Sequence, residues 1–177
     1  ASTKEEACGR FRQQWNIPGD AKLVAGMGVV SARKGTDRFV EVARQAIASD
    51  DRVYFTWIGD FDDSGLSRQI KTAYEEERYP RQLIFTGPMA YAPTNLLPFD
   101  LFFLSSVEDP YPLVVLEAAY QGVPSVCFAN SGGITEFAGE GAGYILADGS
   151  AADTAESLVT ILQDPESRDA VAAAARE

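Results

Sequence analysis

Histidine is absent from this 177-residue sequence, and cysteine occurs only twice, as Cys8 and Cys127. Without an imidazole the chain alone cannot build a Ser-His-Asp triad, a Cys-His dyad or a His-ligated zinc site. Two cysteines outside any C-x-x-C spacing cannot supply a four-thiolate metal site, and they exclude a disulfide-rich secreted scaffold. We therefore expect a reducing, cytoplasmic setting, with the cytoplasmic face of a membrane as an alternative for a longer protein.

Positive charge is also scarce, because 15 Lys and Arg stand against 26 Asp and Glu, which gives a net charge of −11. Proteins that bind nucleic acid need basic faces, so we expect no nucleic-acid partner. Long apolar runs are missing as well. None reaches the roughly 18 residues that a membrane helix needs, so no membrane span is expected. The chain begins at Ala1 without a Met, and we expect it to be a piece of a longer protein.

Six short apolar runs recur along the chain and predict β-strands. They are rich in β-branched and aromatic residues, and they are continuous rather than alternating. Continuous apolar strands are typical of a parallel sheet that is buried on both faces by helices. Strands are predicted at residues 23–30, 53–59, 82–87, 101–105, 125–129 and 144–147.

The intervals between these runs predict helices at residues 36–49, 66–77, 112–121 and 150–162, with a last alanine-rich helix after Asp164. Alternating strands and helices indicate an α/β class, here a Rossmann-like doubly wound parallel sheet of about six strands in one domain. We expect residues 1–20 to form a lead-in helix (5–15) and linker, and residues 21–177 to form the Rossmann-like domain.

Ligands bind such folds at the carboxyl ends of the strands, where small residues let a ligand approach the backbone. Gly28 ends the first run and is a candidate contact of this kind. A dinucleotide fingerprint fails there because Ser31 stands where the third glycine belongs. Arg33 and Lys34 come just before the helix predicted at 36–49, where two cations in an acidic protein indicate an anion site or plain surface charge.

Metal ligation is a weaker interpretation of the acidic turn after the second strand. Asp60 and Asp62 form a D-x-D that could hold a metal, but Lys71 replaces the Glu that a calcium loop requires. We favour a solvated turn in which Asp63 or Ser64 caps the next helix. No metal site is therefore predicted.

Glu117 is the most informative acidic residue, because the helix around it is otherwise apolar. A buried carboxylate needs a partner, which is an Arg, a Lys, a backbone amide or the two hydroxyls of a ribose. Asp109 comes eight positions earlier, about 12 Å away at helical rise, which is comparable to a nucleotide-sugar from ribose to sugar ring. Gly132 and Gly133 follow the fifth strand, where successive backbone N–H groups bind an anion or simply form a turn.

Three segments, RKGTDRF, SSVEDPYPLVVLEAAYQGVPSV and NSGGITEF, occur in an order and spacing that resembles a known family. They are similar to the C-terminal, donor-binding domain of retaining glycosyltransferases with the two-domain GT-B fold, a family that includes sucrose synthases and bacterial mannosyl- and glucosyltransferases. The resemblance covers about residues 22–163. It implies a nucleotide-diphosphate sugar as donor substrate, no cofactor and no catalytic metal.

The resemblance also implies roles for individual residues. Lys34 grips the donor phosphates, joined by Arg33, because the position of the family's usual phosphate-binding Arg is taken by Val29. Glu117 holds the ribose. Asp109 lies beside the transferred sugar, where the family usually has Glu. Backbone N–H groups of Gly132, Gly133 and Ile134 lie near the sugar and the diphosphate.

The expected function is therefore the donor-binding part of a glycosyltransferase that moves a hexosyl group to a saccharide or lipid acceptor. Lys34 and Asp109 are the expected catalytic residues, and an N-terminal domain, absent from this chain, is the expected partner that binds the acceptor. Alone, the chain is expected to bind donor without efficient transfer. Two alternatives remain open: a non-catalytic nucleotide-binding or interaction module on the same fold, and a nucleotide-sugar epimerase of the GT-B type.

Overall fold

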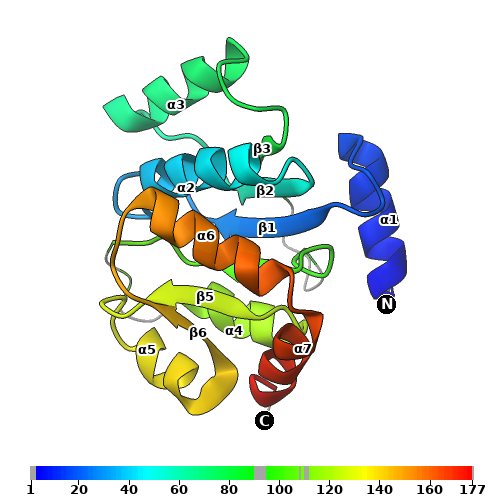
Figure 1. The fold of residues 1–177 in the computed structure, drawn as a ribbon. Coiled ribbons are helices and arrows are strands. Elements are labelled where there is room, and N and C mark those ends of the chain that lie inside the picture. Colours follow the sequence, from blue (N-terminus) through cyan, green and yellow to red (C-terminus); the bar gives the residue numbers. More distant parts are fainter. Residues whose placement is uncertain (1–2, 90–94, 108, 110–111, 177) are drawn as a thin grey trace.

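The computed structural model describes residues 3–89, 95–107, 109 and 112–176. In this part of the chain six strands form one parallel sheet with the order β3-β2-β1-β4-β5-β6 (Figure 1). The order reverses between β1 and β4, as in a doubly wound Rossmann-like fold, so the predicted fold class is confirmed. The strands are β1 Lys22–Met27, β2 Val53–Ile58, β3 Leu83–Gly87, β4 Leu101–Phe103, β5 Ser125–Phe128 and β6 Gly143–Leu146.

The first strand is shorter than the run predicted at 23–30. β1 ends at Met27 because Gly28 adopts a φ of 139°, which turns the chain out of the strand. Beyond this turn Val30 makes only an isolated bridge with Phe61. The apolar run is therefore a strand followed by a loop at the carboxyl edge of the sheet.

The helices are α1 Lys4–Trp15, α2 Thr36–Ser49, α3 Gly65–Glu75, α4 Leu113–Tyr120, α5 Ile134–Phe137, α6 Ala151–Leu162 and α7 Pro165–Ala174. Their amino ends follow the sequence signals: Ser150 and Asp153 form a capping box on α6, and the Asp164 side chain caps α7. Ser64, rather than Asp63, caps α3. Sequence analysis missed α5 and the π-helical turn η1 Ala138–Ala142 that follows it, because so short a segment shows no helical periodicity.

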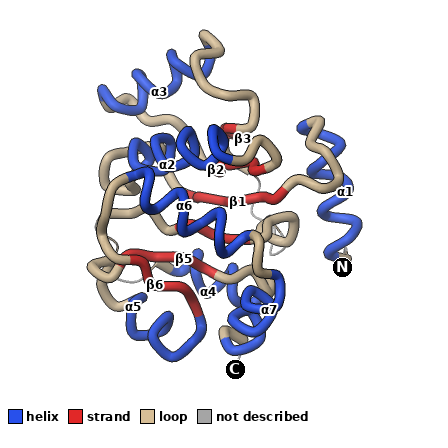
Figure 2. The backbone as a smooth tube through the Cα atoms, in the orientation of Figure 1, coloured by secondary structure: helices blue, strands red, loops and turns tan. Residues whose placement is uncertain are grey.

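Alternate side chains of β1 to β5 enter two separate cores, whereas the edge strand β6 contributes to only one of them. In β2, Phe55 and Trp57 pack with α2, α3 and α6, whereas Tyr54 and Ile58 pack on the other face with α1, α4 and α5. Figure 2 shows the strands between these helices, with α2 and α6 in front of the sheet. The sheet is thus buried on both faces, which is why its strands are continuously apolar.

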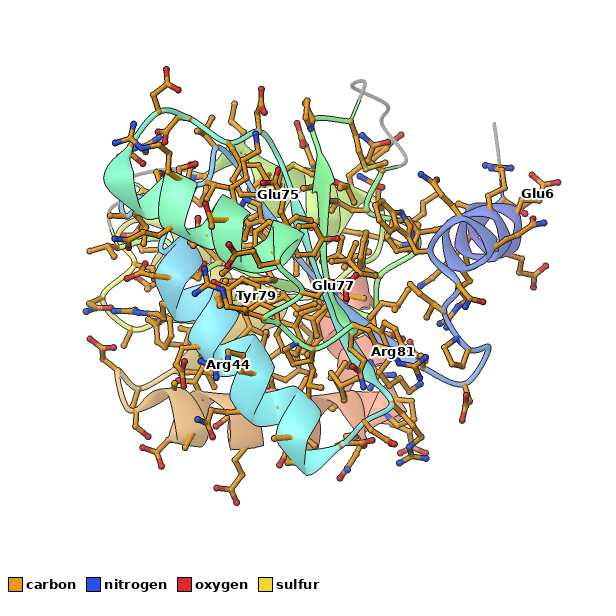
Figure 3. All side chains as sticks on the ribbon, turned by 90° about the horizontal axis from the view of Figure 1, so that it is seen from above. Glu6, Arg44, Glu75, Glu77, Tyr79 and Arg81 are labelled. Atoms are coloured by element: carbon orange, nitrogen blue, oxygen red, sulfur yellow. The ribbon has the colours of Figure 1, made fainter. Side chains whose placement is uncertain are left out.

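The ends of the sheet differ in what surrounds them. α1 lies to one side of the molecule (Figure 3). Phe11 of this helix packs edge-on against Phe99 at a centroid distance of 5.1 Å. Arg44 of α2 and Tyr79 lie on the side of α3, in the same view. The carboxyl ends of β1 and β5 and the amino ends of α2 and α6 lie together at the left of Figure 1.

Within the described residues, no helix is both long and apolar enough to cross a membrane.

Candidate functional site

A cavity of about 690 Å³ opens at the carboxyl ends of β1 and β2, beside the point where the strand order reverses. Parallel α/β sheets bind ligands at this place because the loops on the two sides diverge there. Most of its wall is apolar and comes from β1, the loop after β3 and one face of α4. The lining residues include Met27, Gly28, Ile58, Asp60, Met89, Leu96, Leu113, Leu116, Glu117, Tyr120 and Gln121.

Glu117 brings a carboxylate to this apolar cavity from the middle of α4. The side chain is half-buried, and among the described residues no hydrogen bond or ion pair reaches its carboxylate. Its backbone oxygen accepts hydrogen bonds from the Gln121 side-chain amide and from the Gln121 backbone N–H, each at 3.2 Å. The protein partner that was one alternative for Glu117 is therefore not found in the described chain, and the carboxylate faces space that a ligand can enter.

Lys34 and Asp109 meet beside the cavity although they are 75 residues apart. The Lys34 Nζ lies 2.6 Å from Asp109 Oδ2, and the two side chains are only 19% and 11% exposed. The methylene groups of Lys34 cross Gly28, where an added Cβ would approach them to 3.1 Å. Because Gly28 lines the cavity, this charged pair lies at its border.

The backbone around Lys34 is fixed by contacts with the loop after β4. Gly35 has a φ of 65°, and an added Cβ would overlap the carbonyl oxygen of Ser105. The Ser105 hydroxyl donates to the Lys34 carbonyl at 3.1 Å, and the Val107 N–H donates to the Arg33 carbonyl at 3.1 Å. The loops after β1 and β4 are thus joined, which holds Lys34 opposite Asp109.

Gly28 contributes space rather than a free amide. Its N–H donates to the Ile58 carbonyl at 2.9 Å, and its carbonyl accepts a 2.8 Å hydrogen bond from Trp57 Nε1. An added Cβ at the neighbouring Gly59 would overlap that same carbonyl. Sequence analysis missed the role of Trp57, whose place in an apolar strand gave no sign of its hydrogen bond.

Arg33 and Val29 are exposed at the same edge of the sheet. Val29 lines the cavity and is 48% exposed, at the position where an arginine was expected on the family resemblance. The Arg33 side chain is exposed and makes no hydrogen bond or ion pair with the described residues. The predicted pair of cations is therefore split: Lys34 is held by Asp109, whereas Arg33 faces solvent.

The Gly132-Gly133 loop follows β5, the strand next to β4. Gly132 has a φ of 79°, and α5 begins directly after Gly133. No acceptor for the N–H groups of Gly132, Gly133 or Ile134 is found among the described residues, and the two glycines are exposed. These groups are therefore available to an anion.

The helix that carries Glu117 begins at Leu113, one residue after its predicted start at 112, and Pro112 is its extended N-cap with φ −74° and ψ 102°. Asp109 therefore lies before the helix, as predicted, and its spacing of about 12 Å from Glu117 stays a prediction. Glu108, Pro110 and Tyr111 of this motif lie outside the described residues.

The acidic turn after β2 has the local bonding of a capped loop. Asp60 Oδ1 accepts from the Phe61 N–H at 2.8 Å, and Asp62 Oδ1 accepts from the Ser64 N–H at 3.0 Å. The hydrogen bonds from Ser64 hold the pKa of Asp62 below its usual value. In the part of the chain that is described, no three His, Cys, Asp or Glu side chains gather as a metal site would require.

Gln121 is a second residue that sequence analysis did not assign to the site. It is buried, and its Oε1 accepts a 2.9 Å hydrogen bond from the Leu96 N–H, so it ties α4 to the segment that forms another wall of the cavity. The signal in the sequence that could identify it is a polar side chain in an otherwise apolar segment.

A family model described as "Glycosyl transferases group 1" matches residues 9–177. The chain belongs to this family. The six-stranded parallel sheet is the Rossmann-like half of a GT-B fold, and Lys34, Asp109, Glu117 and the Gly132-Gly133 loop lie after neighbouring strands of this group 1 glycosyltransferase domain.

Two curated relatives share part of their sequence with the domain. Alpha-galactosylglucosyldiacylglycerol synthase of Streptococcus pneumoniae (strain ATCC BAA-255 / R6) is 30% identical over 122 residues, which are 65% of this chain and 30% of the relative. Processive diacylglycerol alpha-glucosyltransferase of Acholeplasma laidlawii is 28% identical over 125 residues, 70% of this chain and 36% of the relative. The matched segment thus spans about a third of each relative.

Solved structures share the fold at lower identity. The crystal structure of Anabaena HepE in complex with UDP superposes with a TM-score of 0.82 at 22% identity, covering 98% of this chain and 48% of that one. The C-terminal domain of the group 1 glycosyl transferase LpcC from Francisella tularensis gives a TM-score of 0.78 at 19% identity, covering 99% of this chain and 90% of that one.

Proposed function

We propose that this chain is the donor-binding domain of a retaining, metal-independent glycosyltransferase that transfers a hexosyl group from a nucleotide-diphosphate sugar to a saccharide or lipid acceptor. The observation that carries the proposal is the cavity at the strand ends, which borders the Lys34–Asp109 pair and contains the Glu117 carboxylate, for which the described residues provide no partner. A nucleotide sugar has a matching chemistry, with hydroxyl donors, a planar base for apolar walls, and a diphosphate for a cation.

Glu117 binds the ribose in this proposal. A carboxylate has two oxygens, and each accepts a hydrogen bond from one of two neighbouring hydroxyls. The apolar side chains on the same face of α4, Leu113, Leu116 and Tyr120, then contact the base. The absence of a protein partner for the Glu117 carboxylate in the described chain supports this role, because a half-buried charge gains most from hydrogen-bond donors that a ligand brings.

Lys34 acts on the diphosphate. During transfer the bond between C1 of the sugar and the β-phosphate oxygen breaks, and its electron pair stays on the departing diphosphate. A cation and backbone N–H groups that already point there stabilise this growing charge. Lys34, Arg33 and the N–H groups of Gly132, Gly133 and Ile134 supply this stabilisation, so no metal ion is required.

Asp109 lies beside the transferred sugar and holds Lys34 in place. The acceptor hydroxyl forms the new bond to C1 on the face that the diphosphate leaves, which retains the configuration, and its proton passes to the departing β-phosphate oxygen. The acceptor is held by a separate N-terminal domain of the full-length protein. Names of the two curated relatives refer to diacylglycerol glycolipids, which makes a glycolipid the first acceptor to test.

Isothermal titration of this chain with UDP, GDP and ADP tests the proposal, and UDP is the first choice because HepE was crystallised with UDP and with UDP-glucose. We expect one nucleotide to bind, with equal affinity in the presence of EDTA. A free nucleotide concentration of 100 times the dissociation constant should raise the free energy of unfolding by about 2.7 kcal/mol. Glu117→Ala should lose binding at least tenfold, whereas Glu156→Ala, an exposed glutamate of α6, should not. Flat titrations with all three nucleotides would refute the donor-domain function.

A further inference from the structure

Arg38 connects the amino end of α2 with two other loops at the carboxyl edge of the sheet. It lies four residues after Lys34, in the first turn of α2. Its guanidinium carbon is 4.5 Å from the centroid of the Phe128 ring, and its Nη1 is 3.7 Å from Asp148 Oδ1. Phe128 is the last residue of β5, and Asp148 follows β6, so one side chain of α2 contacts the carboxyl ends of two neighbouring strands.

Asp148 extends this contact to the glycine loop. Its second oxygen accepts a 3.2 Å hydrogen bond from Asn130 Nδ2. Asn130 is followed by Ser131, which closes the turn: the Ser131 N–H donates to the Phe128 carbonyl at 3.0 Å, and the Phe128 N–H donates to Ser131 Oγ at 3.1 Å. Gly132 and Gly133 come next, so the orientation of their N–H groups depends on this turn.

We propose that Arg38 and Asp148 are positioning residues that hold the loop of residues 129–133 toward Lys34, and that they thereby set the affinity for the diphosphate-sugar part of the donor. The proposal rests on the donor-binding function proposed above. Neither residue contacts the cavity, and each acts through the loop.

Two physical arguments support a positioning role. Glycine backbones have wide conformational freedom, so a Gly-Gly loop needs contacts on its flanks to present N–H groups in one direction. The Arg38–Asp148 pair is also partly solvent-exposed, with 31% and 51% of the two side chains accessible, and ion pairs in contact with solvent add little to global stability. Loss of this pair should therefore change the position of the glycine loop without a large change in the free energy of unfolding of the domain.

The test compares two ligands that differ in what they bring to the loop. UMP carries the base, ribose and one phosphate, whereas UDP-glucose adds the β-phosphate and the sugar. In titrations of the chain, Arg38→Gln and Asp148→Asn should each lower the affinity for UDP-glucose about fivefold, which corresponds to the loss of one hydrogen bond. The affinity for UMP should stay within about twofold of the parent value. The double variant should not be weaker than the single ones, because both changes break the same connection.

Arg44→Gln is the matched control. Arg44 lies on the same helix and pairs with Glu41 at 3.4 Å, but it is on the side of α3 (Figure 3). It should change neither affinity. Thermal midpoints of all variants should stay within a few degrees of the parent, as expected for exposed pairs.

Amide resonances of the ligand-free, ¹⁵N-labelled chain provide a readout that needs no donor. Arg38→Gln and Asp148→Asn should shift the signals of Gly132 and Gly133, and Arg44→Gln should not. Unchanged glycine signals together with parental UDP-glucose affinity would overturn the positioning role, and so would an equal loss for UMP and UDP-glucose. Failure of the donor function itself is a different result, in which the parent chain binds neither ligand.

Discussion

Lys34 and Asp109 form an ion pair between the loop after β1 and the loop after β4, with 2.6 Å between Nζ and Oδ2. Both side chains are mostly buried, so solvent screens the pair less than it screens Arg38–Asp148 or Arg44–Glu41. In the proposed function, Asp109 neutralises Lys34 when no donor is bound, and a bound diphosphate would take over part of the Lys34 contact. The two residues should then respond in opposite ways to neutralisation.

Lys34→Met should weaken UDP binding at least tenfold, because a charge-assisted bond to phosphate is lost. Asp109→Asn should leave UDP affinity unchanged or raise it, since one negative charge near the diphosphate disappears. Isothermal titration measures both, and Lys71→Met, an exposed lysine of α3, serves as the control for loss of a positive charge. An equal loss of UDP affinity in Lys34→Met and Asp109→Asn would contradict the prediction that the two charges affect diphosphate binding in opposite directions.

The loop that holds Lys34 should be sensitive to substitution of Gly35. Gly35→Ala places a Cβ against the carbonyl oxygen of Ser105 in addition to straining a φ of 65°, and it should lower the free energy of unfolding by roughly 3 kcal/mol. Gly141→Ala has a comparable φ of 86° with nothing within 4 Å of the added Cβ, so it should cost only about 1 kcal/mol. Urea denaturation of both variants checks this difference, and equal losses would show that the clash with Ser105 is absent.

Gln121 should matter for the shape of the cavity, because its side chain joins two of the cavity walls. Gln121→Leu keeps the volume but leaves the buried Leu96 N–H without its acceptor, which should destabilise the chain by about 1–3 kcal/mol. Because this bond joins two walls of the cavity, nucleotide affinity should fall as well. Gln121→Glu retains an acceptor oxygen and should recover part of the stability. Parental stability of Gln121→Leu in urea would argue against the bond.

The fold was predictable because its strands are buried on both faces and read as continuous apolar runs. Helix ends with a polar cap, such as Ser150 and Asp164, were predictable for a similar local reason. The short helix α5 was not, because it is too brief to show a period. The apolar run predicted a first strand that continues to residue 30, whereas β1 ends at Met27. The cause is the positive φ of Gly28, which cannot be inferred from an apolar pattern.

The site was predictable only in part. Lys34, Asp109 and Glu117 were singled out by their type and by family resemblance, but the Lys34–Asp109 contact depends on β1 lying next to β4, which no local pattern reveals. Arg38 and Asp148 are ordinary surface charges in the sequence. Their connection appears only when the carboxyl ends of β5 and β6 are placed beside α2.

Cys127 should report unfolding of the sheet. Burial raises the pKa of this thiol in β5 to about 11, so at pH 8 only about one molecule in a thousand carries the reactive thiolate. In a Cys8→Ser background, Ellman's reagent should label the native chain very slowly and the urea-unfolded chain rapidly. Labelling of native Cys127 at the rate of free cysteine would contradict its burial.

The same raised pKa gives a pH dependence of known sign. Between the ordinary thiol pKa and about 11, the unfolded chain has lost the Cys127 proton while the folded chain keeps it. Unfolding then releases a proton, so the free energy of unfolding should fall as the pH rises through this window, and no such contribution should appear below it. Urea titrations from pH 7 to 10.5 in the Cys8→Ser background measure the slope. Cys127→Ala removes the thiol and should flatten the slope, whatever the cost of the smaller side chain at neutral pH; an equal slope in both variants would assign the dependence to other groups.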